Sequence, residues 1–533
     1  MTKSTSLYYL RDDLYFEPLL HKWYAWPYLL PPVAAAMNLT ARNLRLMKSF
    51  VANSKLHISA SRTPGLAGGD FVNCSEEQVE EVRALIHELE NEYQDYFQLR
   101  QAVSELNVLL EQQKGMSMEA LYSAVPAPLQ GYVELVYDME HHASFRLIEG
   151  LLYQGSLYKR EAQSISLGLL GRVTERPFVL SSPRLPDQNH LHVAVEFADR
   201  WIDRLFALRD SPASREAIET LFAGQSLSGQ LAVDALFTET APARRHVPVD
   251  AGVRVSYLGH AGVMLETPGA AMLVDPVIAS RDGVHDDDLI SFSELPPFID
   301  YVCITHTHMD HLCLETLLQL RRKIGVVLVP KSTGTLYDPS IKLMLQTLGF
   351  TVRDMDEMER VAFSDGAIVA LPFLGEHADL NIRSKSAWYF DLLGKKILIG
   401  ADSASLDKHL YRRIFDAIGK IDMLFIGMEC VGAPMSWLYG ALFTKPIPRA
   451  INESRRFNGS DCASAAEMAA IFTPDHLFVY ALGTEPWFKY FMGVDYTLDA
   501  RQIVESDRLL AFCQAHQIDG ERLMAKRVWQ LPI

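Results

Sequence analysis

Apolar residues recur at helical spacing in the first part of the chain. Between Glu76 and Gln113, valine, leucine and isoleucine return every three or four positions among many acids, which predicts a long amphipathic helix. Similar patterns predict helices over Tyr132–Tyr153 and over Glu196–Leu208. Residues 1–240 are therefore expected to form a mainly α domain, and we find no catalytic signature in them.

The pattern changes after residue 240. Residues 241–250 carry prolines and charges without periodicity, which indicates a linker. Short strand-like runs then alternate with glycine, proline, aspartate and helical patterns. These runs are Val253–Leu258, Val263–Glu266, Met272–Val274, Tyr301–Thr305, Gly325–Val329, Ala367–Leu371, Lys396–Ile399 and Met423–Ile426. The order predicts an α+β protein in which residues 251–533 form two sheets sandwiched between helices.

Composition excludes several classes of protein. A length of 533 residues favours more than one core, and a formal net charge of −16 argues against a nucleic-acid binder, which needs a cationic face. The beginning lacks the apolar core of a signal peptide, and no uncharged apolar stretch approaches the roughly 20 residues that span a bilayer. The six cysteines are scattered, so we expect reduced thiols and a cytoplasmic protein without membrane contact.

One basic segment contrasts with the negative net charge of the chain. Arg42, Arg45, Lys48 and Lys55 follow one another within a short stretch of the amino-terminal domain. Such a segment is either a solvated face or a surface that docks an acidic partner.

The strongest chemical signal is the hexapeptide His306-Thr307-His308-Met309-Asp310-His311, which directly follows an apolar strand. Imidazole and carboxylate both bind divalent transition metals. Because His306 and His308 alternate, they point the same way and can hold one ion, whereas Asp310 and His311 face a second ion. The hexapeptide therefore predicts a site for two metals.

This hexapeptide resembles the HxHxDH signature of the metallo-β-lactamase superfamily and matches it at every fixed position. The resemblance extends from about Val253 to the end of the chain and includes the upstream sequence Leu258–Gly262. It implies an αββα sandwich for the carboxy-terminal domain. It also implies that Asp402, just past a predicted strand, bridges the two metals.

The sequence departs from the superfamily at the Gly-His turn, which here reads Gly375-Glu376-His377. By the resemblance, Glu376 occupies the place of a ligating histidine. A carboxylate in that place favours iron or manganese over zinc. In the competing interpretation His377 is the ligand. The usual last histidine has no clear counterpart, so Glu429 and Glu485, which follow later strands, are further candidates for direct or outer-sphere ligation.

The whole chain resembles a narrower family, the di-iron β-hydroxylases of nonribosomal peptide biosynthesis. The resemblance rests on the amino-terminal run Tyr8–Leu19, the hexapeptide, Glu376 and Asp402, together with the length and domain order. It implies that dioxygen and an external electron donor hydroxylate the β-carbon of an aminoacyl group. That group is held as a thioester on the phosphopantetheine arm of a peptide-synthetase carrier domain.

The same resemblance implies roles for individual residues. One iron is held by His306, His308 and Glu376, the other by Asp310 and His311, and Asp402 bridges the pair. Glu376 is expected to take part in catalysis, because a flexible carboxylate can change its coordination mode. The amino-terminal domain is expected to form a homodimer and to dock the synthetase.

Aromatic residues after the late strands suggest the kind of substrate. Trp437, Tyr439 and Trp487 are candidates for lining a channel that takes an aromatic aminoacyl chain, although ordinary core packing explains each one equally well. The alternative function, from a different class, is a binuclear zinc or manganese hydrolase that cleaves a phosphodiester, lactone or amide.

Overall fold

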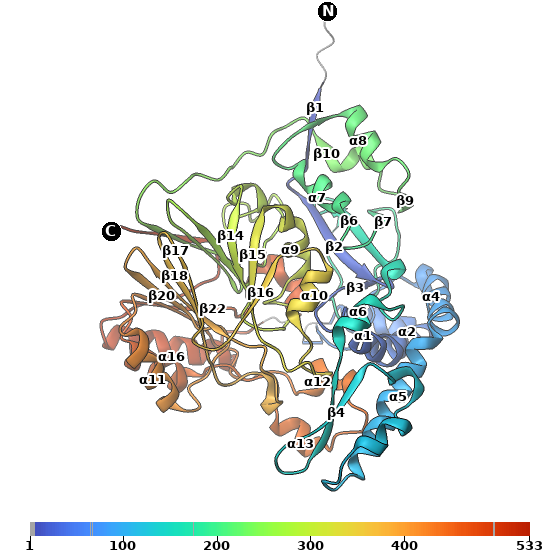
Figure 1. The fold of residues 1–533 in the computed structure, drawn as a ribbon. Coiled ribbons are helices and arrows are strands. Elements are labelled where there is room, and N and C mark those ends of the chain that lie inside the picture. The colour runs from blue at the N-terminus through green and yellow to red at the C-terminus, as the bar shows by residue number, and fades with distance from the viewer. Residues whose placement is uncertain (1–5, 64, 67, 174, 494–495) are drawn as a thin grey trace, which may run out of the picture.

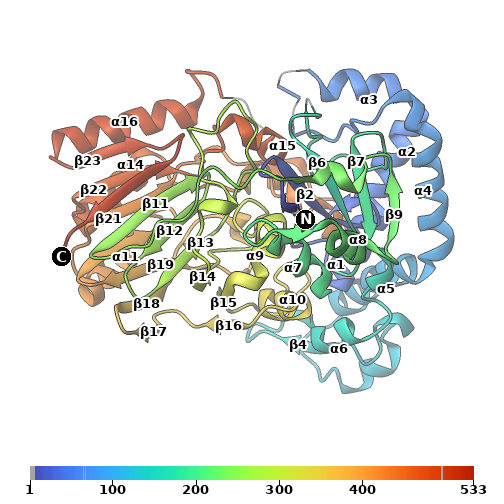
Figure 2. The same ribbon diagram turned by 90° about the horizontal axis from the view of Figure 1, so that it is seen from above.

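The computed structural model describes residues 6–533 except 64, 67, 174 and 494–495. Figure 1 shows two parts: an amino-terminal part rich in helices, and a layered sandwich of sheets and helices. Figure 2, seen from above, shows the two parts side by side, with the short helix α15 (Lys489–Met492) near their junction. Within the described ranges, no helix is long and apolar enough to cross a membrane.

The amino-terminal helices form one layered group. Its members are α1 (Pro32–Asn38), η1 (Leu39–Asn43), α2 (Leu44–Ala52), α3 (Ser54–Ser61), α4 (Val79–Glu92) and α5 (Gln94–Glu111). The long helix predicted from Glu76 to Gln113 is in fact two helices, because Tyr93 leaves the helical conformation between them. This break lets α4 pack against α2 while α5 packs against α1.

A five-stranded antiparallel sheet also lies in this part, and the apolar pattern did not predict it. Its order is β3-β2-β6-β7-β9, with bounds β2 (Leu14–Leu20), β3 (Trp23–Tyr24), β6 (Gln163–Leu169), β7 (His190–Ala194) and β9 (Ser226–Gly229). Strands β2 and β6 are buried along their whole length. Since both faces are covered, neither strand shows the alternation by which a half-exposed strand is recognised.

The helix predicted over Tyr132–Tyr153 was wrong for most of its length. The chain forms a hairpin of β4 (Val133–Tyr137) and β5 (Ala143–Leu147), and only α6 (Glu149–Gln154) is helical. Buried and exposed residues alternate at the start of β4, which is strand rather than helix spacing. The third predicted helix is present as α7 (Arg200–Ala207), which starts at the Asp199 cap.

Shorter elements complete the amino-terminal part. Strand β1 (Leu7–Leu10) pairs with β8 (Ala213–Ser214) and β10 (Phe237–Thr238), and α8 (Arg215–Phe222) follows β8. No helix or strand occurs between β10 and residue 253.

The carboxy-terminal part is an αββα sandwich of two seven-stranded sheets. The first sheet has the order β16-β15-β14-β13-β12-β11-β24, with bounds β11 (Val253–Gly259), β12 (Gly262–Glu266), β13 (Ala271–Val274), β14 (Ile299–Cys303), β15 (Ile324–Pro330), β16 (Val352–Met355) and β24 (Arg527–Leu531). The second has the order β17-β18-β19-β20-β21-β22-β23, with bounds β17 (Arg360–Phe363), β18 (Gly366–Leu371), β19 (Ala387–Leu392), β20 (Lys395–Ile399), β21 (Met423–Gly427), β22 (His476–Tyr480) and β23 (Asp519–Arg522).

Three apolar layers hold the sandwich together. The layer between the sheets joins residues such as Val255 and Val263 to Phe390 and Phe425. Outside the first sheet lie α9 (Leu314–Leu320) and α10 (Ile341–Thr347). Outside the second lie α11 (Lys408–Ile418), α14 (Cys462–Phe472) and α16 (Arg501–Ala515). The predicted fold class is therefore the observed one.

A buried ion network joins the two parts. Arg176 donates to Glu17 of β2 and to Glu315 of α9, with nitrogen–oxygen distances of 2.8 Å to each, and Arg184 donates to Glu17 as well. Burial alone would raise the pKa of Glu17, but Arg184 and Arg176 hold it below its usual range. The ion pairs of Glu17 with the two arginines therefore stabilise the folded state fully at neutral pH. This contribution is lost as the pH falls through the pKa of Glu17 in the folded state.

Replacing Arg176 by methionine is expected to lower the free energy of unfolding by about 3–5 kcal/mol, because Glu315 stays buried without its cation. Denaturant titration followed by circular dichroism measures this change. The control is Arg146→Met, which removes the exposed Arg146–Glu134 pair of the hairpin and should cost less than about 1 kcal/mol. Equal losses in both variants would contradict the role given to the buried network.

Candidate metal centre

The predicted ligands lie where strands of the two sheets end. The hexapeptide follows β14, and Glu376 and Asp402 follow β18 and β20. Strand β18 runs antiparallel to β19, and β19 runs antiparallel to β20, so β18 and β20 point the same way. Ligands that are distant in the sequence therefore meet at one edge of the sandwich.

One group of ligands consists of His306, His308 and Glu376. Their nearest ligand atoms all lie within 4.8 Å of one another, and His308 Nδ1 is 2.9 Å from Glu376 Oε1. All three residues are buried. This is the set that the sequence assigned to one metal.

A second group consists of His260, Asp310 and His311. His260 Nε2 lies 3.0 Å from Asp310 Oδ2. Asp402 lies between the two groups, because its Oδ2 is 3.1 Å from His311 Nε2 and 3.7 Å from His306 Nε2. A carboxylate in this place is positioned to contact ions in both groups.

The donor atoms fit bound cations. The Nε2 atoms of His306 and His311 are buried and have no hydrogen-bond partner among the described residues, and both lie beside Asp402 Oδ2, at 3.7 and 3.1 Å. A buried polar group without a partner costs about 1–3 kcal/mol, so two that face one small space need a ligand. Imidazole nitrogens with carboxylate oxygens are a donor set that suits divalent transition metals.

Two of the ligands, His306 and Asp310, are in the forms that bind metals. Burial, followed by the neighbouring His311 and His308, holds the pKa of His306 well below its usual range, so its imidazole is neutral. Burial would raise the pKa of Asp310, but the His311 and His260 imidazoles hold it below its usual range, so it stays a carboxylate. Neutral imidazole and ionised carboxylate are the forms that bind metals.

Burial would lower the pKa values of His308 and His311, but neighbouring carboxylates raise them. Glu376 raises that of His308, and Asp402 with Asp310 raises that of His311. These two imidazoles must therefore release protons when metal binds.

A further carboxylate orients one of the ligands. Asp275 follows β13 and is fully buried, with its Oδ2 atom 2.8 Å from His311 Nδ1. Its other oxygen accepts a hydrogen bond of 2.7 Å from the Thr305 backbone N–H. A carboxylate behind a histidine fixes the ring so that Nε2 points to the metal.

The Gly-His turn brings Glu376 into a ligand group, whereas the ring of His377 packs beside those of His306 and His308. Residues 376–379 all have φ between 52° and 56°, a left-handed conformation that non-glycine residues rarely adopt. Such strain costs of order 1–3 kcal/mol per residue and is typical of functional sites. His377 Nδ1 lies 3.0 Å from the Tyr439 hydroxyl, and none of the ligand groups found among the described residues includes His377. The geometry therefore favours Glu376 as the ligand.

Glu429 and Glu485 lie near the centre without joining a ligand group. Glu485 accepts hydrogen bonds from the His260 backbone N–H, at 2.7 Å, and from the Tyr257 hydroxyl, so it supports the turn that carries His260. Glu429 accepts hydrogen bonds from two backbone N–H groups, the Gln502 amide and the Tyr496 hydroxyl. These contacts hold Glu429 in the wall of a cavity that lies beside the ligand groups.

A cavity of about 320 Å³ opens directly onto the predicted ligands. We call it the metal cavity. Its walls are formed mainly by apolar and aromatic side chains, among them Trp437, Leu438, Phe457, Phe491 and Met492. Apolar walls with a few polar groups are typical of a site for a small organic substrate.

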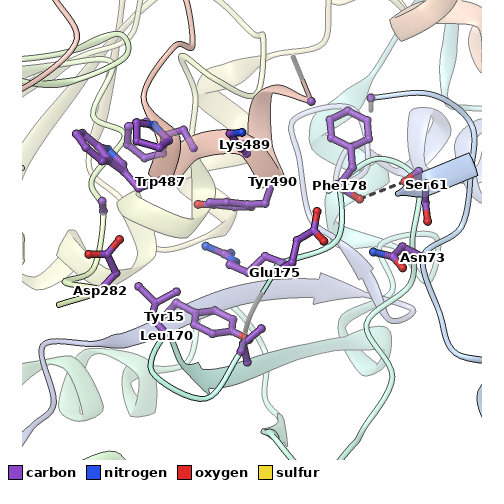
Figure 3. A pocket seen from close by; sticks show the side chains of 18 of the residues that line it. Tyr15, Ser61, Asn73, Leu170, Glu175, Phe178, Asp282, Trp487, Lys489 and Tyr490 are labelled. Carbon is purple, nitrogen blue, oxygen red and sulfur yellow. Dashed lines mark hydrogen bonds between the residues drawn. The ribbon is translucent and has the colours of Figure 1, made fainter. Parts of the chain in front are cut away.

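The three aromatic residues proposed to bind substrate lie in different places. Trp437 lines the metal cavity. Tyr439 is buried behind it and contacts both His377 and Tyr28, so it supports the site from outside. Trp487 lines a second cavity of about 540 Å³, shown in Figure 3 together with Tyr490. We call this second space the junction cavity.

Sequence reasoning missed the place of His260. It lies in the turn after β11, with φ of 48°, and reaches Asp310 only because β11 and β14 belong to the same sheet. The available signal was the Gly259-His260 pair directly after an apolar strand. A second missed feature is Tyr28, whose hydroxyl lies 3.0 Å from Thr307 Oγ1 and ties the amino-terminal part to the hexapeptide.

The chain is similar to known proteins over almost its whole length. Residues 9–242 match the family described as the di-iron non-haem beta-hydroxylase N-terminal domain, and residues 271–437 match the beta-lactamase superfamily domain. The 4-amino-L-phenylalanyl-[CmlP-peptidyl-carrier-protein] 3-hydroxylase of Streptomyces venezuelae is 36% identical over 98% of this chain and 100% of its own length.

Solved structures are similar to the chain over almost the same length. The crystal structure of CmlA, a di-iron beta-hydroxylase from Streptomyces venezuelae, superposes with a TM-score of 0.91 at 33% identity, over 99% of this chain and 100% of that one. A mutant of CmlA gives a TM-score of 0.89 at 33% identity, over 98% of this chain and 100% of its own.

Replacing His260 by alanine is expected to lower the number of metal ions bound per chain from two toward one, because the second ligand group loses an imidazole. Metal analysis of the purified variant measures this number. The matched control is His142→Ala, since His142 lies exposed in the β4–β5 hairpin and should leave the metal content unchanged. Two metals in the His260 variant would show that His260 only supports Asp310.

Proposed function

The chain belongs to the family of non-haem di-iron β-hydroxylases, and from this membership we propose that it hydroxylates the β-carbon of an aminoacyl group tethered to a carrier domain. The group is held as a thioester on the phosphopantetheine arm of a nonribosomal peptide synthetase. Dioxygen is the co-substrate, and an external donor supplies electrons. The observation that carries the proposal is Glu376 beside His308, in a chain that matches a carrier-dependent 3-hydroxylase from end to end.

The proposed ligand roles follow the two ligand groups and the position of Asp402 between them. We assign His306, His308 and Glu376 to one iron, Asp310 and His311, with His260, to the other, and Asp402 to both. Two irons bound there supply the redox chemistry that activates dioxygen, which protein side chains do not provide. The carboxylate of Glu376 makes its ion site harder than a third imidazole would.

The protein's own residues would orient the substrate and keep water away from the reacting carbon. The aromatic and apolar walls of the metal cavity suit an aromatic aminoacyl side chain. Glu429, Tyr496 and Gln502 form a polar group in the same wall. This group is placed to bind the polar part of an aminoacyl substrate.

The hydrolase alternative has less support. A binuclear zinc or manganese hydrolase would share the hexapeptide and Asp402. It would not account for the match of residues 9–242 to a hydroxylase-specific domain or for the carboxylate at position 376.

Further proposals concern organisation and partners. We propose a division into an amino-terminal domain (1–240), a linker (241–250) and a catalytic domain (251–533). The amino-terminal domain would form a homodimer and dock the carrier domain of the synthetase. The six cysteines are unpaired, which supports a cytoplasmic location.

The test is a product assay. The reduced iron-loaded enzyme is offered, in air, a panel of carrier domains loaded with different amino acids, aromatic ones included. Mass spectrometry is expected to find one added oxygen atom on at least one aminoacyl group. If no member of the panel gains oxygen while a phosphodiester, lactone or amide is cleaved, the hydrolase alternative replaces the proposal.

The same assay includes the Glu376→His variant, which should bind metal with a changed preference and lose oxygen-dependent turnover, because the flexible carboxylate is gone. Glu140→Gln is the control, since Glu140 is an exposed residue of the β4–β5 turn. Normal hydroxylation by the Glu376→His variant would disprove the catalytic role of this carboxylate.

A further inference from the structure

A large cavity lined by cations lies between the amino-terminal helices and the segment that carries Trp437. It has a volume of about 960 Å³ and is bounded by η1 and α2 on one side and by α12 (Ser436–Tyr439) and η10 (Gly440–Leu442) on the other. The helices α2 and α12 are labelled in Figure 1. Its charged lining residues are Arg42, Arg45, Lys48, Arg100 and Asp70. We call this space the basic cavity.

The charges of the basic cavity favour an anion. Four cations line it, and Asp70 is the sole acid among its described lining residues. Asp70 is shared, because Arg42 and Arg45 both donate to it, at 2.9 and 2.7 Å. Lys48 pairs with Glu90 outside the lining. Even when Glu90 is counted with Asp70, four cations against two acids leave an excess of two positive charges, in a protein whose formal charge is −16.

Three of these cations, Arg45, Lys48 and Arg100, are exposed and can reach a ligand from solvent. The side chains of Arg45 and Lys48 are 67% and 53% exposed, whereas that of Arg42 is buried. Guanidinium binds phosphate through two parallel hydrogen bonds, and the lysine ammonium adds a point charge. The cavity therefore combines a buried arginine, Arg42, with three exposed cations.

The basic cavity adjoins the metal cavity. Trp437 lines both of them. Arg42 donates to the Trp437 backbone oxygen at 3.2 Å, and the Trp437 indole N–H donates to the Gly68 oxygen at 3.2 Å. Since Gly68 also lines the metal cavity, Trp437 is held as a shared wall between the cations and the predicted metal ligands.

We propose that the basic cavity binds the phosphodiester of the carrier domain's phosphopantetheine arm. This inference rests on the proposed function. The arm carries one anion at its protein-bound end and the aminoacyl thioester at the other end. The chain offers both groups in neighbouring cavities, because the cations line one cavity, the predicted metal ligands line the other, and Trp437 lines both.

The junction cavity of Figure 3 is a poorer site for this anion. It also borders the metal cavity, since Gly68 and Gly493 line both. However, its charged lining residues are Glu175, Asp282 and Glu315 against Arg176 and Lys489, and Arg176 is already committed to Glu17 and Glu315. Acids outnumber cations there, so a phosphodiester is repelled rather than attracted.

Binding of two small probes to the iron-loaded enzyme tests the proposal. Isothermal titration compares 4′-phosphopantetheine with pantetheine, which lacks only the phosphate. The native enzyme is expected to bind the phosphorylated probe at least about tenfold more tightly, the range of charge-assisted hydrogen bonds. Arg45→Gln and the double variant Arg45→Glu with Lys48→Glu should remove most of that difference, and Lys114→Glu, an exposed lysine outside the cavity, should keep it.

Equal binding of the two probes by the native enzyme would overturn the proposal, as would a phosphate preference that survives both charge variants. Inorganic phosphate that competes as strongly as the phosphorylated probe would show a general anion site and would overturn it as well. The product assay reports separately on the proposed function. If the native enzyme hydroxylates carrier-bound substrate but lacks the phosphate preference, only the proposed binding of phosphate in the basic cavity is disproved.

With active enzyme, a kinetic measurement adds a second readout. The charge variants should raise KM for the carrier-bound substrate by about tenfold, leave kcat unchanged, and leave KM unchanged for an aminoacyl-pantetheine thioester. An equal rise for both substrates would contradict recognition of the phosphate.

Discussion

Several imidazole and carboxylate atoms face one another in a buried space at the edge of the sandwich. The Nε2 atoms of His306 and His311 both lie there beside Asp402 Oδ2, and neither has a hydrogen-bond partner among the described residues. The cost of leaving such atoms unpaired is large relative to the stability of a domain. Bound metal would remove this cost, and the strained turn at residues 376–379 places Glu376 in the same group of ligands.

The amino-terminal part completes the site rather than standing apart from it. Tyr28 contacts Thr307 of the hexapeptide, and Arg176 bridges Glu17 and Glu315 across the junction. Arg42 holds the Trp437 segment from the same side. A domain attached this closely provides the walls of the cavities, and with them the means to recognise a tethered substrate.

The sequence predicted those features that depend on local order. The hexapeptide supplied four candidate ligands, which the structure brings together, because they are neighbours after one strand. The fold class followed from short runs of strand and helix. Glu376 and Asp402 came from resemblance to a family. His260 was missed, because its role exists only once β11 and β14 share a sheet.

The errors of the sequence analysis have equally physical causes. The buried strands β2 and β6 show no alternation, so nothing marked the sheet they form. The segment from Tyr132 to Tyr153 has apolar residues at spacings that fit a helix, yet it forms a hairpin because tertiary packing decides between the two. The place of Trp437 beside a basic cavity could not be predicted from the sequence. It depends on contacts between residues about 400 positions apart, such as the one between Arg42 and Trp437.

A glutamate in the place of a histidine would make the metal centre an iron site. The most direct measurement is metal analysis of the purified protein combined with its optical spectrum. Two irons per chain, with visible or near-ultraviolet bands from a bridged ferric pair, are the predicted result. Two colourless zinc ions in a fully active protein would contradict the claim, although the fold would stand.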